Sequence, residues 1–207
     1  MITIKECDAV KFISTKCINE KPDILLIAGP TGSGKSTISQ KISNVLKAQN
    51  LSQDNYFKNE KDMELVMPEH GIRQWDTPDC YQWELLIKNI TDIFNKNATP
   101  IPIFSHAMSR RVGEREFQLT NRPLIFEGLY TMDQRILDII QGIRLKHYSV
   151  FLDIDEKTRW QRKYNRDVTE RNENPETLRI WFENVIKPAE LKWLNQQAKN
   201  ADIVVTP

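Results

Sequence analysis

Residues 24–38 read ILLIAGPTGSGKSTI, a short apolar run followed directly by a segment rich in glycine and hydroxyl residues. The apolar part, residues 24–28, is typical of a strand buried on both faces of a sheet. From Ser36 onward, apolar residues recur at helical spacing up to Leu46. The stretch therefore predicts a strand, a tight glycine-rich loop and a helix.

The loop fits the phosphate-binding pattern G-x-x-x-x-G-K-[ST] at every fixed position from Gly29 to Ser36. Its glycines let backbone N–H groups point inward around phosphate oxygens, and the following helix adds the positive end of its dipole. We expect Lys35 to reach the β and γ phosphates and Ser36 to bind Mg²⁺. An ordinary glycine-rich turn is the alternative, but the flanking strand and helix favour a nucleotide site. The residues expected to bind nucleotide are Gly29, Thr31, Gly32, Ser33, Gly34, Lys35, Ser36 and Thr37.

Composition limits the remaining function classes. The 207 residues carry a formal net charge of +1, so no bulk charge favours nucleic acid or a membrane surface. No apolar run approaches the length of a transmembrane helix, and the charged first residues are unlike a signal peptide. The three cysteines lack CxxC spacing, which predicts reduced thiols in a cytoplasmic protein. The sequence leaves open whether the protein forms a homo-oligomer.

Short apolar runs alternate with longer amphipathic segments along most of the chain. Further strand candidates lie at residues 51–53, 124–126, 150–154 and 203–205. This alternation predicts an α/β fold of the P-loop NTPase type, with three layers and a parallel sheet of about five strands. Residues 1–22 are interpreted as an N-terminal extension, and residues 23–207 as the P-loop domain.

A small-molecule kinase, a GTPase and a motor ATPase compete as classes of P-loop protein. The only Asn-Lys pair, Asn95-Lys96, is not followed by the Asp that a guanine-reading box needs, and a motor ATPase usually needs a longer chain. A kinase needs a carboxylate near the phosphates, a second acidic group for Mg²⁺ and mobile positive charge. Asp54 and Glu127 follow strand candidates, at the sheet edge where ligands bind. Four arginines follow at spacings of three, four and five: Arg159, Arg162, Arg166 and Arg171.

Each of these features also has a purely structural interpretation. Asp54 could cap a turn, and Glu127 could simply end a strand. The arginines could form a solvated helix face with Asp167 and Glu170. Beside a phosphate loop, the kinase interpretation is favoured for all three.

Several segments together resemble the uridine kinase and phosphoribulokinase family, from about residue 23 to the C-terminus. They are GPTGSGKST, LSQDNYF, WDTPDCYQWELL, IPIFSHAMSRR, LIFEGLYT and FLDIDEKTRWQRKYNRDVTER, in the family's order. The resemblance implies ATP-dependent phosphorylation of a primary hydroxyl, with uridine or cytidine to the 5′-monophosphate as the nearest precedent. It also implies a substrate flap at about residues 55–76 and a helical lid at about residues 156–173.

The resemblance assigns roles to individual residues. It makes Asp54 the general base, with Lys35 and Arg166 as the other catalytic groups, and it places Ser36, Glu127 and Asp54 at the metal. Arg159, Arg162 and Arg171 would contact ATP from the lid. The expected substrate residues are Phe57, Trp75, Asp76, Phe104, Ser109, Arg110, Lys163 and Trp181.

The chain departs from the family pattern where the base is read. Ser109 occupies the place of a family His, with His106 three residues earlier, and Trp181 occupies the place of a Gln. A different acceptor, such as a sugar phosphate or a vitamin precursor, therefore stays open, with Arg110 and Arg111 as candidate phosphate ligands. A regulatory ATP-binding module without an acceptor is the other alternative.

Overall fold

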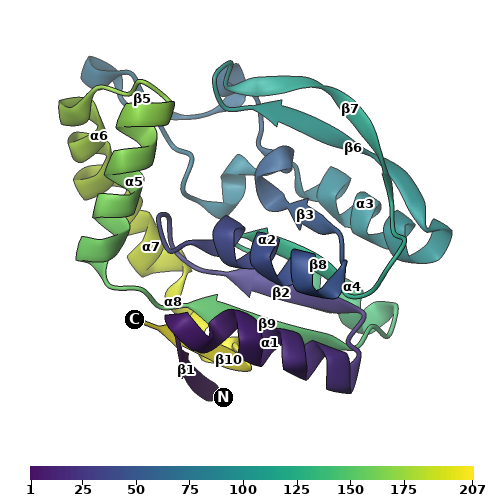
Figure 1. The fold of residues 1–207 in the computed structure, drawn as a ribbon. Coiled ribbons are helices and arrows are strands. Elements are labelled where there is room, and N and C mark those ends of the chain that lie inside the picture. The colour runs from purple at the N-terminus through teal and green to yellow at the C-terminus, as the bar shows by residue number, and fades with distance from the viewer.

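The structure, a computed structural model, describes residues 1–207 and is built around a six-stranded sheet (Figure 1). All neighbouring strands in this sheet are parallel. Their spatial order is β1 (Ile2–Lys5), β10 (Ile203–Thr206), β9 (His147–Leu152), β2 (Ile24–Ala28), β8 (Leu124–Gly128) and β3 (Asn50–Ser52). The predicted α/β class is confirmed, with one strand more than the five or so that the sequence indicates.

Helices cover both faces of the sheet. On one face, α1 (Glu6–Glu20) and α2 (Lys35–Leu46) pack on Leu25 and Ile27 of β2. On the other face, Ile24 and Leu26 pack in a larger core with α3 (Trp83–Lys96), α4 (Gln134–Gly142) and α8 (Asn195–Asn200). Alternate side chains of one strand thus enter two different cores, which is why residues 24–28 are apolar without interruption.

The first 22 residues differ from their interpretation as an extension. Ile2 in β1 pairs with Ile203 of β10, so the segment supplies an edge strand of the main sheet. Ala9 and Ile13 of α1 are fully buried in the core beneath that sheet. The residues of β1 are mostly exposed, and the four-residue strand leaves too little alternation in the sequence to be recognised.

Two antiparallel hairpins rise from the sheet edge that carries the carboxyl ends of the strands. The smaller one, β4 (Leu65–Met67) with β5 (Ile72–Arg73), lies within the expected flap. The longer one pairs β6 (Ala98–Ser105) with β7 (Arg110–Gln118). This second hairpin is not predicted from the sequence, because prolines interrupt β6 and charged residues fill β7.

The expected lid is helical. Asp155 is the N-cap of helix α5 (Glu156–Glu170), and its side chain accepts a hydrogen bond from the Thr158 amide at 2.9 Å. After it come α6 (Pro175–Trp181), a π-helical turn (Phe182–Ile186), α7 (Lys187–Trp193) and α8. The 3₁₀ helices span Gln53–Tyr56, Glu60–Asp62, Pro68–His70 and Pro78–Cys80. None of the helices has the length and apolar character needed to cross a membrane.

Candidate active site

A cavity of about 1620 Å³ opens between the phosphate loop, the hairpins and α5. It lies at the carboxyl ends of the parallel strands, where open α/β sheets bind ligands. The expected site residues that line it are Thr31, Gly32, Gly34, Lys35, Ser36, Thr37, Asp54, Phe57, Trp75, Asp76, Phe104, Ser109, Arg162, Lys163, Arg166, Arg171 and Trp181. The structure thus brings most of the expected residues to one cavity.

The phosphate loop is shaped by two left-handed glycines. Gly32 has a φ of +74° and Gly34 a φ of +92°, a region that other residues rarely adopt. A Cβ at Gly32 would lie 2.4 Å from the backbone oxygen of Arg159 at the base of α5. The loop therefore requires glycine there, both for its backbone conformation and for the close approach of the lid.

Lys35 and Ser36 lie at the start of α2. Nζ of Lys35 donates to the Pro30 oxygen at 3.0 Å, and burial lowers the pKa of Lys35 although Glu127 and Asp54 oppose the shift. Oγ of Ser36 donates to Oε2 of Glu127 at 3.1 Å. Burial, reinforced by the Asp54 charge, raises the pKa of Glu127. A hydroxyl beside two carboxylates suits a hard cation that keeps several water or phosphate ligands, as Mg²⁺ does.

Asp54 projects from the 3₁₀ helix after β3 into the cavity. The hydroxyl of Ser52 caps this helix by accepting from the Asp54 amide at 3.3 Å, so the Asp54 carboxylate is not needed as a cap. Desolvation in the cavity raises the pKa of this carboxyl, while Lys35, Arg171 and Arg166 oppose the rise. A carboxylate with a raised pKa, facing the phosphate loop, is placed to accept a proton.

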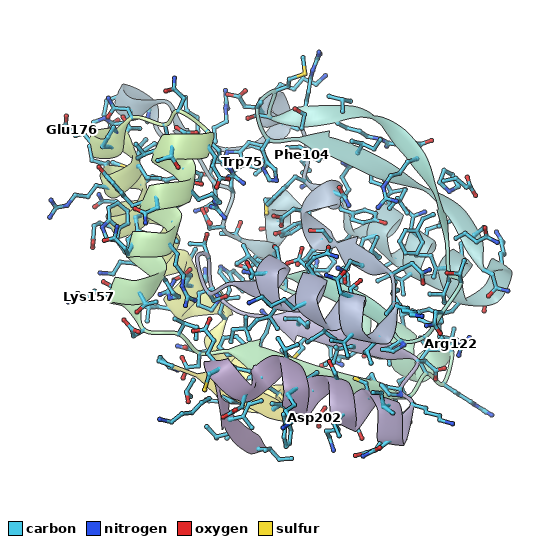
Figure 2. All side chains as sticks on the ribbon, in the orientation of Figure 1. Trp75, Phe104, Arg122, Lys157, Glu176 and Asp202 are labelled. Carbon is cyan, nitrogen blue, oxygen red and sulfur yellow. The ribbon has the colours of Figure 1, made fainter.

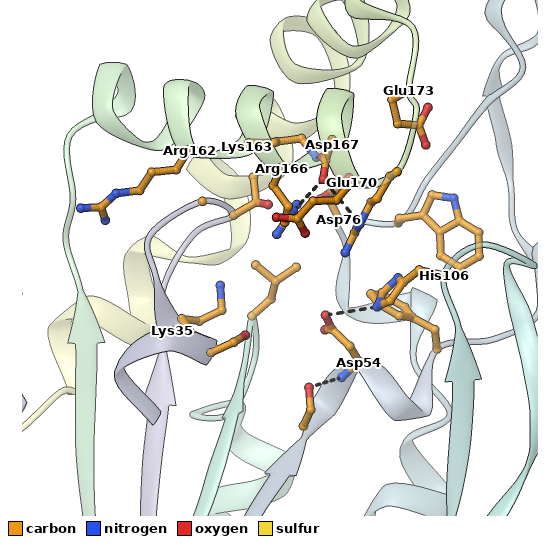
Figure 3. Close-up of a pocket in the computed structure, with 18 of the residues that line it drawn as sticks. Lys35, Asp54, Asp76, His106, Arg162, Lys163, Arg166, Asp167, Glu170 and Glu173 are labelled. Atoms are coloured by element: carbon orange, nitrogen blue, oxygen red, sulfur yellow. Dashed lines mark hydrogen bonds and ion pairs between the residues drawn. The ribbon is translucent and has the colours of Figure 1, made fainter. Parts of the chain in front are cut away.

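The lid presents an organised set of charges to the cavity (Figure 3). Asp167 is buried and bonds Nζ of Lys163 and Nε of Arg166, both at 2.6 Å, while Arg171 lies 3.6 Å away. Burial alone would raise the pKa of Asp167, but Arg166 and Lys163 lower it to about 2. The arginines are therefore not a solvated face. Asp167, which the alternative interpretation would leave on a solvated face, holds Lys163 and Arg166 in position.

Aromatic rings form the wall opposite the lid. The ring of Phe57 lies 5.5 Å from those of both Trp75 and Phe104, and Trp75 and Phe104 point toward each other (Figure 2). His106, at the turn of the long hairpin, adds a ring 5.4 Å from Phe104. At these distances the rings contact one another edge-on or tilted, so they form one continuous aromatic surface beside the cavity.

Two buried polar atoms near this wall have no partner. Oδ2 of Asp76 and Nε1 of Trp181 are enclosed without a partner at normal hydrogen-bonding distance, and both residues line the cavity. Burial raises the pKa of Asp76 to about 7, against the opposing charge of Lys163. The Trp181 side chain lies near enough to Asp76 to lower that pKa slightly. Unsatisfied buried groups carry a free-energy cost, so their presence here indicates a place for ligand polar groups.

Five expected residues do not line the cavity: Gly29, Ser33, Arg110, Glu127 and Arg159. Glu127 is still in contact with the site through Ser36. Arg159 is instead buried, pairs with Glu190 at 3.0 Å and donates to the Thr31 oxygen at 3.1 Å. Arg110 is exposed at the start of β7.

Sequence reasoning missed His106, Asp167 and Glu190 as site residues. His106 had only its place in a predicted loop, Asp167 looked like a partner on a solvated face, and Glu190 carried no signal. His106 and Glu190 act by contacts between segments far apart in the chain, which a single sequence does not reveal. The contacts of Asp167 are local, but its burial depends on what packs against the helix.

A phosphate loop after a central parallel strand, with a carboxylate at a neighbouring strand end and a basic lid, defines a P-loop phosphotransferase. Comparison with known proteins gives the family. The chain belongs to the phosphoribulokinase / uridine kinase family, whose sequence model matches residues 24–207. It is therefore an ATP-dependent kinase that acts on a hydroxyl of a small metabolite.

Individual relatives are consistent with this family assignment. The uridine kinase of Limosilactobacillus reuteri is 27% identical over 190 residues, covering 90% of this chain and 84% of that protein. That of Staphylococcus haemolyticus is 28% identical over 185 residues, covering 88% and 86%. The fold matches a structure described as a "Possible Uridine Kinase" from Bacillus stearothermophilus, with a TM-score of 0.69, 16% identity and coverage of 96% and 97%. It also matches phosphoribulokinase from Rhodobacter spheroides, with a TM-score of 0.61, 14% identity and coverage of 90% and 70%.

Proposed function

We propose that this kinase transfers the γ-phosphoryl group of MgATP to the primary hydroxyl of a pyrimidine nucleoside, uridine or cytidine. The observation that carries the proposal is the position of Asp54, with Lys35 and the phosphate loop on one side and the aromatic wall on the other. A nucleoside base fits the wall of Phe57, Trp75 and Phe104, and buried Asp76 offers an acceptor for ribose hydroxyls. The uridine kinases among its relatives support the same acceptor class.

Asp54 has the role of general base. It accepts the proton of the acceptor hydroxyl as that oxygen attacks the γ-phosphorus. Its raised pKa brings it closer to neutral pH and makes it a more effective proton acceptor. The positive charges of Lys35, Arg166 and Arg171 face the same space and stabilise the charge on the transferred group.

Ser36, Glu127 and Asp54 are the residues that would hold Mg²⁺. The ion supplies positive charge that neutralises the phosphate oxygens. The Ser36–Glu127 hydrogen bond already places the hydroxyl beside a carboxylate.

Closure of the lid over the flap would exclude water from the transfer. The basic residues of α5 already face the cavity, so a modest approach brings them to the phosphates. A reaction that consumes ATP, in a chain with three free cysteines, suits the cytoplasm.

A phosphorylated acceptor is less well supported. Arg110 lies outside the cavity, and Arg111 is paired with Glu114. Neither arginine lines the cavity, so neither is placed to bind a second phosphate of an acceptor there.

The decisive experiment is ADP release with MgATP against a panel of acceptors: uridine, cytidine, purine nucleosides, ribulose 5-phosphate and pantothenate. Turnover that depends on uridine or cytidine supports the proposal. Turnover only with another acceptor overturns the nucleoside assignment. ATP binding without turnover on any acceptor would favour the regulatory module instead.

A further inference from the structure

The N-terminal helix reaches the active-site cavity. Glu6, Cys7 and Val10 of α1 line it together with the phosphate loop. The family match begins only at residue 24, so these wall residues lie outside it.

The order of the strands in the sheet determines on which side of the phosphate loop these α1 residues lie. In the order β1-β10-β9-β2-β8-β3, β1 and β3 are the two edges and β2 lies between them. All carboxyl ends face the same way, so Glu6 after β1 and Asp54 after β3 lie on opposite sides of the phosphate loop. Arg162 forms an ion pair with Glu6. In Figure 3, Arg162 lies on the side of Lys35 away from Asp54, which agrees with this arrangement.

The direction of bound ATP follows from this order. The γ-phosphate has to lie near Asp54 for the hydroxyl to be activated during attack. The loop from Gly32 to Thr37 holds the phosphate chain. The ribose and base then extend away from Asp54, toward α1.

We propose that α1 forms one wall of the subsite for the nucleoside half of ATP, with Glu6 as its polar contact and Val10 as its apolar one. The inference rests on the proposed function, since it needs ATP in this cavity. It gives a role to an N-terminal segment that the family match does not include.

Contacts around Glu6 support this role. Oε2 of Glu6 accepts from Nη2 of Arg162 at 2.9 Å, and Nη1 of Arg162 donates to the Ser33 oxygen at 3.2 Å. A Cβ on Gly34 would lie 3.8 Å from Oε1 of Glu6, so the carboxylate stands directly beside the loop. An ionised carboxylate only accepts hydrogen bonds. It therefore suits ligand donors, such as ribose hydroxyls or the amino group of adenine.

Cys7 provides a direct probe of this wall. It is exposed and lines the cavity, whereas Cys17 and Cys80 are buried and serve as internal controls. We would measure the iodoacetamide alkylation rate of Cys7 by mass spectrometry with no ligand, with ADP and with tripolyphosphate. Calorimetry on the same samples reports whether each ligand binds.

The expected result is slowing of Cys7 alkylation by at least about fivefold at saturating ADP, and little slowing by tripolyphosphate. Tripolyphosphate occupies the phosphate loop without a nucleoside, so it controls for lid movement. If ADP binds but leaves the Cys7 rate unchanged, or if tripolyphosphate protects equally, the inference is overturned and the proposed function survives. If ADP does not bind at all, both fail.

A variant tests Glu6 itself. Glu6→Gln should weaken ADP binding by roughly tenfold, as expected for loss of a charged hydrogen bond, and tripolyphosphate binding much less. Asp8→Asn is the matched control, because Asp8 lies in the same helical turn but does not line the cavity. Equal weakening of both ligands by Glu6→Gln would show that Glu6 acts only through Arg162, and would overturn its contact with the nucleoside.

Discussion

Nε2 of His106 lies 4.0 Å from Oδ2 of Asp54. His106 belongs to the turn between β6 and β7, and Asp54 to the 3₁₀ helix after β3. Desolvation, together with the charges of Arg171 and Arg166, lowers the pKa of His106 to about 4. The imidazole is therefore neutral near pH 7, and the pair is not an ion pair. A neutral ring with so low a pKa can hydrogen-bond the acceptor substrate without competing with Asp54 for the proton of its hydroxyl.

We expect His106→Ala to act on the acceptor and not on ATP. The KM for the acceptor should rise by about tenfold, while the KM for ATP stays within about twofold, because the ring faces the aromatic wall. Steady-state kinetics with each substrate varied in turn measure both values. His70→Ala is the control for losing a cavity-lining histidine elsewhere. A larger change in the KM for ATP would move His106 to the nucleotide side.

Replacing the general base should separate chemistry from binding. Asp54→Asn keeps the shape but cannot accept a proton, so kcat should fall by roughly 10²–10⁴. ADP affinity, measured by calorimetry, should change little because the phosphate loop and Lys35 are intact. If the variant turned over at the wild-type rate, the assignment of Asp54 would be wrong.

Asp76 should make stability depend on pH in a defined direction. Its pKa is raised by burial from 3.8 to about 7, so between these values the folded state binds the proton more tightly than the unfolded state. The free energy of unfolding contributed by this group therefore falls as pH rises through that window. Asp76→Asn lacks the titration, and its melting temperature should exceed that of the wild type by roughly 3 °C or more at about pH 8, and by less near pH 5.

Thermal melts at both pH values measure this difference. Asp79→Asn is the control, since Asp79 is exposed in the same segment. A gap between Asp76→Asn and the wild type that grows toward low pH would contradict the prediction. The same variant should lose acceptor affinity, because it loses the buried carboxylate that faces the cavity.

The buried pair of Arg159 and Glu190 should hold the phosphate loop. Glu190 accepts from the Arg159 guanidinium at 3.0 Å and from the Thr31 amide at 2.9 Å. Glu190→Ala leaves the arginine buried without a counter-charge and should cost about 3–5 kcal/mol in the free energy of unfolding, measured with urea. The double variant Arg159→Met with Glu190→Leu should recover most of that loss.

An exposed pair gives the matched comparison. Lys187 and Glu156 lie 3.0 Å apart at the surface, so Glu156→Gln should cost no more than about 1 kcal/mol. If Glu190→Ala cost as little, the buried pair would not stabilise the loop.

The sequence predicts the parts of the site that one segment specifies alone. Residues 24–38 suffice for the strand, the phosphate loop and its helix, because backbone conformation there depends on local glycines. Asp54 follows from its place after a strand. The role of Glu190 cannot be predicted in this way, because it depends on a contact with Thr31, which lies 159 residues away in the chain.

Contacts between distant segments also decide the environment of each lid arginine and the structure of the N-terminal residues, so the sequence alone predicts neither. Arg159 and Arg166 look alike in sequence, but one is buried in an ion pair with Glu190 and the other faces the cavity. Helical spacing cannot distinguish them without knowing what packs on each face. Similarly, β1 has no strong pattern of its own and becomes a strand because β10 offers it an open edge.

The N-terminal helix gives the last test. Ile13 of α1 is fully buried in the core that contains Leu25 and Ile27, so Ile13→Ala should cost about 2–5 kcal/mol in the free energy of unfolding. Ile18 lies on the same helix but is 57% exposed, and Ile18→Ala should change stability by less than about 0.5 kcal/mol. Urea denaturation of the full chain measures both. A separate extension would leave both variants near the wild type, whereas a loss confined to Ile13→Ala would show that residues 1–22 fold as part of the kinase domain.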